Sequence, residues 1–314
     1  MPHVTYAYFT SRKNPLIKNF FDSLHREIAE DYSNKRIVVV DFWAKEPGRA
    51  EFIRSQAPEA AREALIHVPP KPTVWQGEHK LTEVHWWAAC NARNTALCLA
   101  PDGWLVFVDD LSVMLPGYGK QILRAMQREK TITCGAYRKV KNLVVENGNI
   151  VTFEDHPGGR DNRFNYGNDI DGFPCGGNWM YGCSIAAPVE AMLEIGGWPE
   201  ALCDGLSFED VIAGIMMEKK DYRFVYDRLM MTYESEEGHH DGLVMKRSDY
   251  GTSPNDKSHA VLKIAQTGNG FHPNYFDESG IRGLRQRVLA GDPFPIVQIP
   301  QHEWFTGTAL SELK

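Results

Sequence analysis

Residues 104–110, WLVFVDD, are an apolar run that ends in the adjacent carboxylates Asp109 and Asp110. Such a run without polar interruption predicts a strand buried on both faces, as in a parallel sheet. Ligands of open α/β sheets collect at the carboxyl ends of these strands. Packing does not require two acids there, although a solvated loop with a helix cap has the same composition. The stretch predicts an α/β fold and makes its acidic end a candidate site.

Strand and helix patterns alternate on both sides of this stretch. Upstream, residues 3–9 and 36–40 are predicted strands, separated by an amphipathic helix over residues 16–29. Downstream, a helix over residues 118–129 precedes a strand over residues 132–137. The further elements expected are a helix over 86–100, a hairpin over 141–153 around Asn147-Gly148-Asn149, and helices over 188–195 and 208–219. This alternation predicts βαβ units and a largely parallel sheet flanked by helices.

Two stretches lack a regular pattern. Residues 155–178 are rich in Gly, Asp and Asn, which predicts a long loop, and loops of this length are usually functional or disordered. Residues 241–314 form an irregular C-terminal extension with scattered apolar anchors. We expect this extension to pack on the domain and border its ligand site, or to form a homodimer contact.

Composition narrows the class of protein. The 314 residues are 43% hydrophobic and 24% charged, which is typical of a soluble globular protein with a sizeable core. The net charge of −7 disfavours retention on nucleic acid by bulk charge. The 6 cysteines contain no CxxC pair and are expected to be reduced thiols. With no apolar leader pattern and no apolar run near the roughly 20 residues of a bilayer span, we expect a cytoplasmic protein without a membrane span.

Other polar residues are candidates for chemistry at the same sheet edge. Asp41 ends the strand over residues 36–40, where it can line that edge or serve as an ordinary turn residue. Arg93 lies on the helix that precedes WLVFVDD, and its guanidinium can bind a phosphate through two hydrogen bonds or form a surface ion pair. Both readings stay open at this point.

Two clusters follow later in the chain. Glu209 and Asp210 open an amphipathic helix after the turn Gly196-Gly197-Trp198, although the helix dipole alone favours acids there. His239 and His240 lie among acidic residues. Imidazole and carboxylate groups suit Mn²⁺, but a solvated polar loop would have the same composition.

Taken in order, these motifs resemble a known family. The series from Ala92-Arg93-Asn94 through Asp109-Asp110 to Gly196-Gly197-Trp198 and Glu209-Asp210 resembles the GT-A family-2 type of nucleotide-sugar glycosyltransferase, over about residues 3–240. The resemblance implies a Rossmann-like GT-A fold whose mostly parallel central sheet is flanked by helices. It implies the following division: a glycosyltransferase domain over 1–240, with a nucleotide-binding half over 1–117 and an acceptor half over 118–240, and the extension over 241–314.

The resemblance also implies how the donor and metal are bound. The donor residues are Thr10, Ser11 and Arg12 for the base and ribose, Asp41 for the base (typically uracil), Arg93 for the ribose and diphosphate, and Asp109 for the ribose. Asp110 would bind the Mn²⁺ or Mg²⁺ that bridges the phosphates, with His239 or His240 as a further ligand. Leu111 stands where many relatives carry another acid, so the metal is assigned to Asp110.

On the acceptor side, the resemblance implies that Asp210 is the general base of an inverting enzyme, with Glu209 beside it. Trp179 and Tyr181 offer stacking surfaces for an acceptor ring, or are core aromatics. The expected reaction moves a sugar from a UDP-sugar to an acceptor hydroxyl by one in-line displacement. A saccharide is the favoured acceptor, with a protein or a modified nucleic-acid base as alternatives.

Two rival functions remain on the sequence. A nucleotidyltransferase acting on a sugar phosphate would usually carry a Gly-rich phosphate loop after the first strand, which Thr10-Ser11-Arg12-Lys13 matches only in part. A nucleotide- or glycan-binding protein that has lost turnover would keep the fold. The presence of both Asp110 and Asp210 argues against that second rival.

Overall fold

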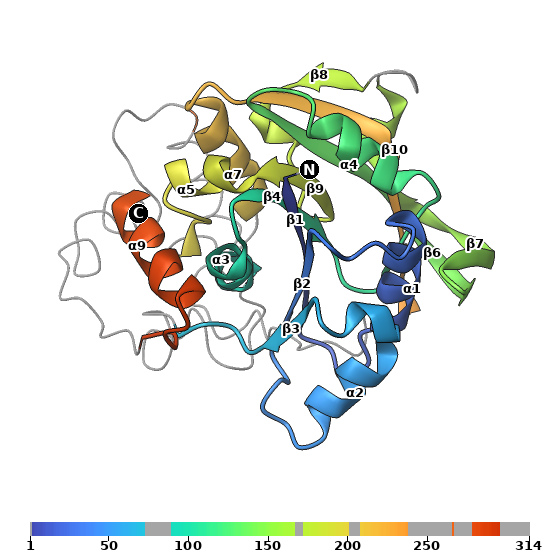
Figure 1. The fold of residues 1–314 in the computed structure, drawn as a ribbon. Helices are drawn as coiled ribbons and strands as arrows, with labels where there is room; N and C mark the ends of the chain where they lie inside the picture. Colours follow the sequence, from blue (N-terminus) through green and yellow to red (C-terminus); the bar gives the residue numbers. More distant parts are fainter. Residues whose placement is uncertain are drawn as a thin grey trace, which may run out of the picture.

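The computed structural model describes residues 2–72, 89–166, 172–200, 208–237, 266 and 278–295. These residues form one mixed β-sheet with helices on both faces (Figure 1). The strand order along its main path is β3-β2-β1-β4-β9-β6-β10-β5, and β7 and β8 pair with β6 and β10. The expected α/β fold is therefore confirmed.

The parallel half of the sheet places the candidate residues at one edge. Its strands are β1 (His3–Thr10), β2 (Lys35–Asp41), β3 (Leu65–Val68) and β4 (Gly103–Val108). In the parallel register, Thr10 lies beside Asp41, and Tyr8 lies beside Val108. Asp109 and Asp110 follow β4 directly, so the chain leaves all three central strands at the same edge.

The remaining strands extend the sheet in mixed directions. They are β5 (Ser112–Met114), β6 (Thr131–Glu146), β7 (Asn149–Arg160), β8 (Phe173–Cys175), β9 (Ser184–Pro188) and β10 (Arg223–Ser235). Strand β9 runs antiparallel between β4 and β6, and β10 runs parallel to β6. Asn147 and Gly148 both have positive φ at the tip of the β6–β7 hairpin, where the sequence predicts the turn.

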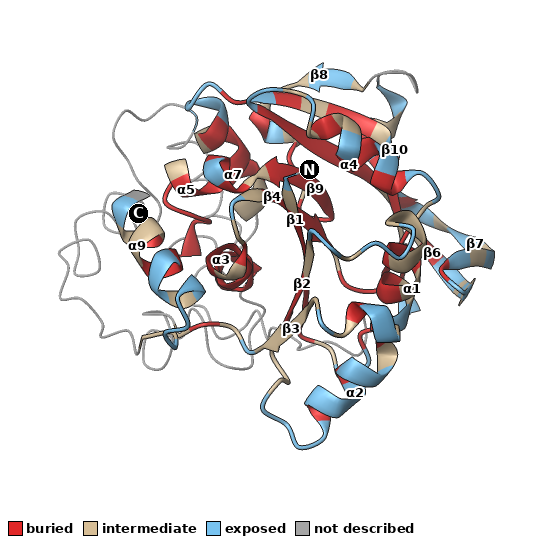
Figure 2. Ribbon diagram, in the orientation of Figure 1, coloured by how far each residue is buried: buried red, intermediate tan, exposed pale blue. Residues whose placement is uncertain are grey.

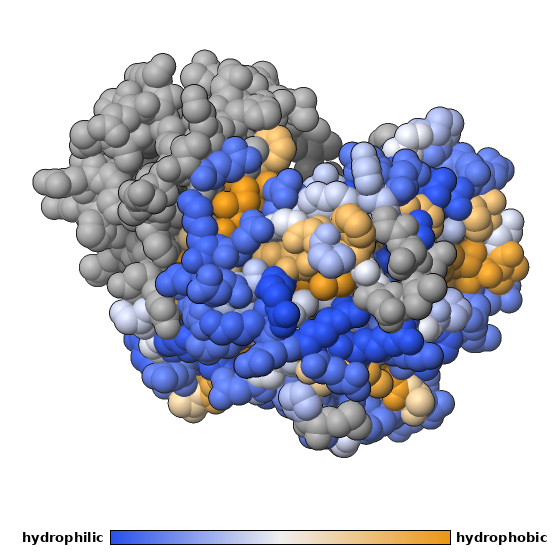
Figure 3. All heavy atoms as spheres, turned by 90° about the horizontal axis from the view of Figure 1, so that it is seen from above, coloured by the Kyte–Doolittle hydropathy of each residue, from blue (hydrophilic) through white to orange (hydrophobic). Residues whose placement is uncertain are grey.

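Helices cover the two faces of the sheet and enclose two apolar cores. One face carries α1 (Ile17–Glu27), α2 (Arg49–Gln56) and α4 (Tyr118–Ala125); the other carries α3 (Ala89–Leu99), α5 (Val189–Glu194), α7 (Glu209–Glu218) and α9 (Glu278–Leu289). Short 3₁₀ turns span Glu59–Ala61, Asn162–Asn165 and Gly177–Trp179. Buried residues concentrate where helices meet strands (Figure 2), and seen from above, the described surface is mostly hydrophilic with an apolar area near its centre (Figure 3).

The prediction of a long loop over residues 155–178 is wrong in part. Strand β7 continues to Arg160, β8 pairs with β10, and two 3₁₀ turns lie between and after them. Asp161 and Arg163 form a buried ion pair with a 2.8 Å contact inside this stretch. Backbone pairing at a sheet edge does not require apolar side chains, so composition alone misjudged the segment.

Within the C-terminal extension, α9 packs on the domain. Ile281 and Leu284 belong to the core on the α3 side of the sheet. Arg285 donates from Nε to the Ala100 carbonyl at 2.9 Å and from Nη2 to Asp102 Oδ1 at 2.7 Å. The division of the chain at residue 240 stays a prediction, as does the homodimer contact.

Two further expectations concern cysteines and membranes. The five cysteines that the structure describes are all free thiols, four of them buried. None of the helices in the described ranges combines the length and the apolar character that a bilayer crossing requires.

Candidate active site

The loop after β1 and the acids after β4 are in direct contact. Thr10 Oγ1 donates a hydrogen bond to Asp110 Oδ2 at 2.8 Å, and Arg12 Nε donates to the same oxygen at 2.8 Å. The backbone N–H of Arg12 donates to Thr10 Oγ1 at 3.1 Å. The family resemblance assigns these residues, which are about a hundred positions apart, to one donor site, and the structure places them in contact.

Leu111, the residue that follows Asp109 and Asp110, points into the protein. It has φ +61° and no exposed surface. The left-handed conformation is unfavourable for a bulky residue, so the surroundings must hold it. They do so through Tyr8, whose hydroxyl accepts the Leu111 N–H at 3.0 Å and donates to the Pro15 carbonyl at 2.6 Å. Leu111 therefore shapes the turn and supplies no ligand.

A third carboxylate, which sequence reasoning missed, lies near Asp109 and Asp110. Glu234 sits near the end of β10 with 2% of its surface exposed, and its Oε1 is 3.4 Å from Lys139 Nζ. Burial raises the pKa of Asp109 to about 7, and the charges of Glu234 and Asp110 add to that effect. The signal was available as the single charged residue in the run LMMTYES.

Asp110 is affected in the same direction. Burial raises its pKa to about 6, although Arg12 and Thr10 favour the ionised form and Glu234 opposes it. Buried carboxylates with raised pKa values create an electrostatic environment that favours a cation. Their oxygens are the donors that Mg²⁺ and Mn²⁺ prefer.

The predicted metal site has no complete set of ligands among the described residues. Within the described ranges, no group of three or more His, Cys, Asp or Glu side chains is arranged to hold a metal ion. Both predicted histidine ligands, His239 and His240, lie outside the described residues.

A second charged cluster forms around Arg93. This side chain is 3% exposed and stacks over the rings of Phe9 and Trp198, with its Cζ 4.9 Å and 4.4 Å from the ring centroids. Arg93 Nη1 donates to Glu209 Oε1 at 3.0 Å. The guanidinium is thereby fixed between the β1 side of the site and the start of α7.

Asp210 completes this cluster. Its Oδ2 accepts the backbone N–H of Gly182 at 2.6 Å, and its Oδ1 accepts that of Val211 at 2.7 Å. Burial raises the pKa of Asp210 to about 6; the charge of Glu209 adds to the shift and that of Arg93 opposes it. A pKa in this range suits a general base that works near neutral pH.

Gly182 permits the close approach of Arg93 and Asp210. A Cβ atom at this position would lie 1.8 Å from Arg93 Nη2, a distance that no side chain could occupy without moving the guanidinium. The residue before Glu209, Phe208, has φ +66°, so the backbone is also strained where α7 begins. Local strain of this kind is frequent at functional sites.

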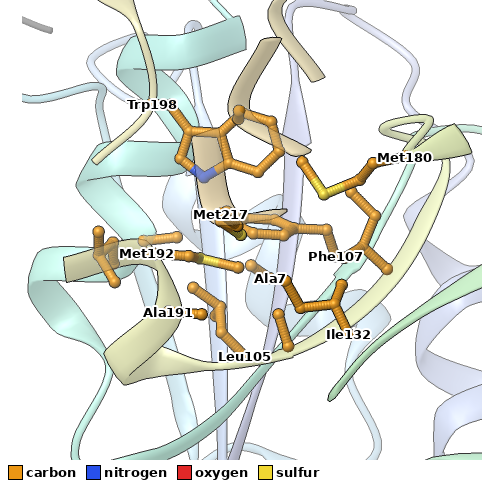
Figure 4. Close-up of a cluster of buried hydrophobic side chains, with 14 of the residues drawn as sticks. Ala7, Leu105, Phe107, Ile132, Met180, Ala191, Met192, Trp198 and Met217 are labelled. Atoms are coloured by element: carbon orange, nitrogen blue, oxygen red, sulfur yellow. The ribbon is translucent and has the colours of Figure 1, made fainter. Parts of the chain in front are cut away.

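The Gly196-Gly197-Trp198 motif has a structural role. Asn94 Oδ1 accepts the Trp198 N–H at 2.7 Å, and Asn94 Nδ2 donates to Glu200 Oε1 at 2.7 Å. Glu200 also pairs with the buried Lys71 at 2.7 Å. This network holds the Trp198 ring against Phe107 in the core, where Figure 4 shows both rings. Asn94 therefore fixes the Gly196-Gly197-Trp198 turn in place, and its neighbour Arg93 extends toward Glu209 and Asp210 in the candidate site.

Asp41 is enclosed at the end of β2. None of its surface is exposed. Its Oδ2 accepts from Arg49 Nε at 2.6 Å and from His67 Nε2 at 3.1 Å, and its Oδ1 accepts the Trp43 N–H at 2.9 Å. Burial alone would raise the pKa of Asp41, but the hydrogen bonds from His67 and Arg49 outweigh burial and lower the pKa.

Trp179 and Tyr181 are both half-buried and pack against the core. The Arg163 guanidinium lies over the Tyr181 ring at 4.0 Å. The Trp179 ring contacts three other aromatic rings at centroid distances of 5.6–5.7 Å, those of Tyr166, Phe173 and Tyr226. The structure supports a packing role for both residues and leaves the edge of the Trp179 cluster partly exposed.

The fold, with its acid-bearing sheet edge, can be compared with known proteins. It matches the GT-A fold of glycosyltransferases of known structure. No protein-family model matches the chain, and no curated protein does. The likeness is therefore one of structure.

Two kinds of solved structure carry that likeness. GalNAc-T7 with UDP, GalNAc and Mn²⁺ matches 84% of this chain and 48% of its own at 12% identity, with a TM-score of 0.51. TarS of S. aureus matches 92% of this chain and 43% of its own at 11% identity, with a TM-score of 0.50. Its fragment 1–349 with UDP matches 70% of its own length at 12% identity and a TM-score of 0.50. The chain thus spans less than half of GalNAc-T7 and of the longer TarS structure, and shares their fold.

Proposed function

We propose that the protein is an inverting glycosyltransferase that moves a sugar from a nucleoside diphosphate sugar, with a UDP-sugar as donor, to an acceptor hydroxyl. The observation that carries the proposal is the presence of two separate charged clusters. In one, Asp110 is paired with Arg12; in the other, Asp210 lies in the field of the Arg93–Glu209 ion pair. Displacement at an anomeric carbon needs a charged group for the leaving diphosphate and a base for the attacking hydroxyl. The GT-A fold, shared with proteins solved with UDP, supports the same conclusion.

The donor is assigned to the first cluster. Thr10, Ser11 and Arg12 would contact the base and ribose, and Asp109 the ribose. Asp110 would hold a divalent metal, Mn²⁺ or Mg²⁺, which when bound neutralises charge on the diphosphate leaving group. Arg93 is buried close to both clusters and adds a fixed positive charge near that leaving group.

The acceptor is assigned to the second cluster. Asp210 would take the proton of the attacking hydroxyl, since two backbone N–H groups orient its carboxylate and leave its basicity in a useful range. Glu209 is paired with Arg93, so we propose that it acts on the acceptor side by setting the charge around Asp210. A saccharide is the proposed acceptor, with its ring against Trp179 and Tyr181.

Calorimetric titration with UDP, with and without Mn²⁺, tests the donor assignment. We expect Mn²⁺-dependent binding of UDP by the full chain, because the buried carboxylates favour a bridging cation. Binding of another nucleoside diphosphate in place of UDP would keep the transferase and change the donor. Failure to bind any nucleoside diphosphate would reject the proposal.

The pH dependence of turnover tests the base. Catalysis needs ionised Asp210, so kcat should fall as the pH drops through about 6, by up to tenfold per pH unit. In Glu209→Gln the negative charge that disfavours ionisation is gone, and the limb of the profile should move to lower pH. If the acidic limb of the kcat profile, measured at saturating donor and acceptor, has the same pH position in Glu209→Gln, the ionisation belongs to another group.

A further inference from the structure

The loop after β1 accepts hydrogen bonds from side chains of the segment that runs from β2 into α2. Three consecutive backbone carbonyls of this loop each accept a hydrogen bond. The Ser11 carbonyl accepts from Trp43 Nε1 at 2.8 Å, and those of Arg12 and Lys13 accept from Arg49 Nη2 at 2.9 Å and Nη1 at 2.6 Å. Because each peptide unit is planar, fixing a carbonyl fixes the N–H that follows it.

Arg49 is itself fixed by Asp41. The guanidinium is 8% exposed, and its Nε donates to Asp41 Oδ2 at 2.6 Å, so all three kinds of guanidinium nitrogen are engaged. A planar guanidinium donates hydrogen bonds from three nitrogens in a fixed fork, whereas the ammonium of lysine donates from one nitrogen only. The site contact that depends on this loop is the bond from Arg12 Nε to Asp110.

Asp41 is poorly placed to read a base directly. It has no exposed surface, and both its oxygens already accept hydrogen bonds, from His67 and Arg49 on one and from Trp43 on the other. The carboxylate keeps some acceptor capacity, but with no exposed surface it could reach a nucleobase only by moving out of its enclosure and breaking at least one of these bonds. Leaving a buried donor unpaired costs free energy that a new contact would have to offset.

We propose that Arg49, oriented by Asp41, is a positioning residue for the nucleoside of the donor, and that Asp41 acts through Arg49 and makes no contact with the base. This inference rests on the proposed function, because it takes the loop of Ser11, Arg12 and Lys13 to be the nucleoside site. Its consequence is that Asp41 contributes to affinity for every nucleotide and does not discriminate between bases.

The comparison of UDP with CDP separates the two roles of Asp41. Uracil presents an N–H donor at N3 where cytosine presents an acceptor, so a carboxylate that contacts N3 favours UDP, and one that contacts the N4 amino group of cytosine favours CDP; either contact makes the two nucleotides respond differently to Asp41→Asn. If Asp41 acts through Arg49, both Asp41→Asn and Arg49→Lys should weaken UDP and CDP by the same factor, roughly tenfold or more. Trp43→Phe removes the hydrogen bond to the Ser11 carbonyl and keeps an aromatic ring at that position. It should weaken UDP and CDP equally, with a smaller loss of affinity.

A buried arginine elsewhere provides the matched control. Arg285 is 7% exposed and binds one carbonyl and one carboxylate, those of Ala100 and Asp102, at the opposite edge of the sheet. Arg285→Lys should lower the melting temperature as Arg49→Lys does, but leave nucleotide affinity unchanged. A purely structural role for Arg49 predicts that both variants behave alike.

The measurement is calorimetric titration of the full chain and its variants with UDP and CDP in the presence of Mn²⁺. Equal losses for both nucleotides in Asp41→Asn, Arg49→Lys and Trp43→Phe support the proposal. A loss confined to UDP in Asp41→Asn, or unchanged affinity in Arg49→Lys, overturns it while the transferase function stands. If the unaltered protein binds no nucleotide, the proposed function fails and the positioning role fails with it.

Discussion

Replacing Asp210 by Asn is expected to lower kcat by roughly 10²- to 10⁴-fold and to leave the affinity for UDP close to that of the unaltered protein. Asparagine keeps the shape of the side chain and one oxygen, which can accept the Gly182 N–H now bonded at 2.6 Å, whereas the Val211 N–H loses its side-chain acceptor. It loses the ability to take a proton at the pH of catalysis. Only the step in which the acceptor hydroxyl is deprotonated should therefore suffer.

The measurement combines steady-state turnover with calorimetric titration by UDP. A matched control is Asp227→Asn, which changes another buried aspartate, one that accepts the Leu229 N–H at 2.9 Å. That variant should lose stability but keep most of its turnover. A large drop in UDP affinity in Asp210→Asn would instead assign this carboxylate to donor binding, and unchanged turnover would remove it from catalysis.

Much of the fold could be predicted because its central strands contain largely apolar runs of strand length. The runs that became β1, β2 and β4 are buried on both faces, so composition and structure agree there. Strands β9 and β10 were missed because they lack a continuous β-branched run: β9 is the short SIAAP, and β10 mixes charged and apolar residues. Propensity for strands also depends on context.

The site shows the same division. Asp41 and the pair Asp109-Asp110 could be placed at one sheet edge from sequence, because each follows a predicted strand and parallel strands end at one edge. Arg12 was assigned to the same site only by the family resemblance. The hydrogen bonds from Arg49 to the loop could not be predicted, because their acceptors are backbone carbonyls, which are the same in every residue. Glu234 was missed for a related reason: its position beside Asp109 depends on the register of β10 against β6 and β5.

Replacing Asp110 by Asn is expected to remove the Mn²⁺-dependent part of UDP binding and to lower kcat/KM by about 10³-fold. The amide is nearly isosteric with the carboxylate and can still accept from Thr10 Oγ1, now 2.8 Å from Oδ2. It is uncharged, so it binds a divalent cation weakly. Arg12 would also lose its ion pair at 2.8 Å, which frees that cation to contact the diphosphate directly.

These two consequences of Asp110→Asn act in opposite directions on nucleotide affinity, and titration separates them. Without metal, the variant should bind UDP at least as well as the unaltered protein, because a carboxylate that repels the phosphates is gone. With Mn²⁺, the unaltered protein should gain affinity and the variant should not. Glu234→Gln is the matched control, since it removes a neighbouring buried charge and should keep the response to Mn²⁺. If Asp110→Asn still gains full UDP affinity with Mn²⁺, the metal is bound by other residues. If Asp110→Asn and Glu234→Gln lose the response to Mn²⁺ equally, the total charge of the cluster is responsible, and Asp110 is not a specific ligand.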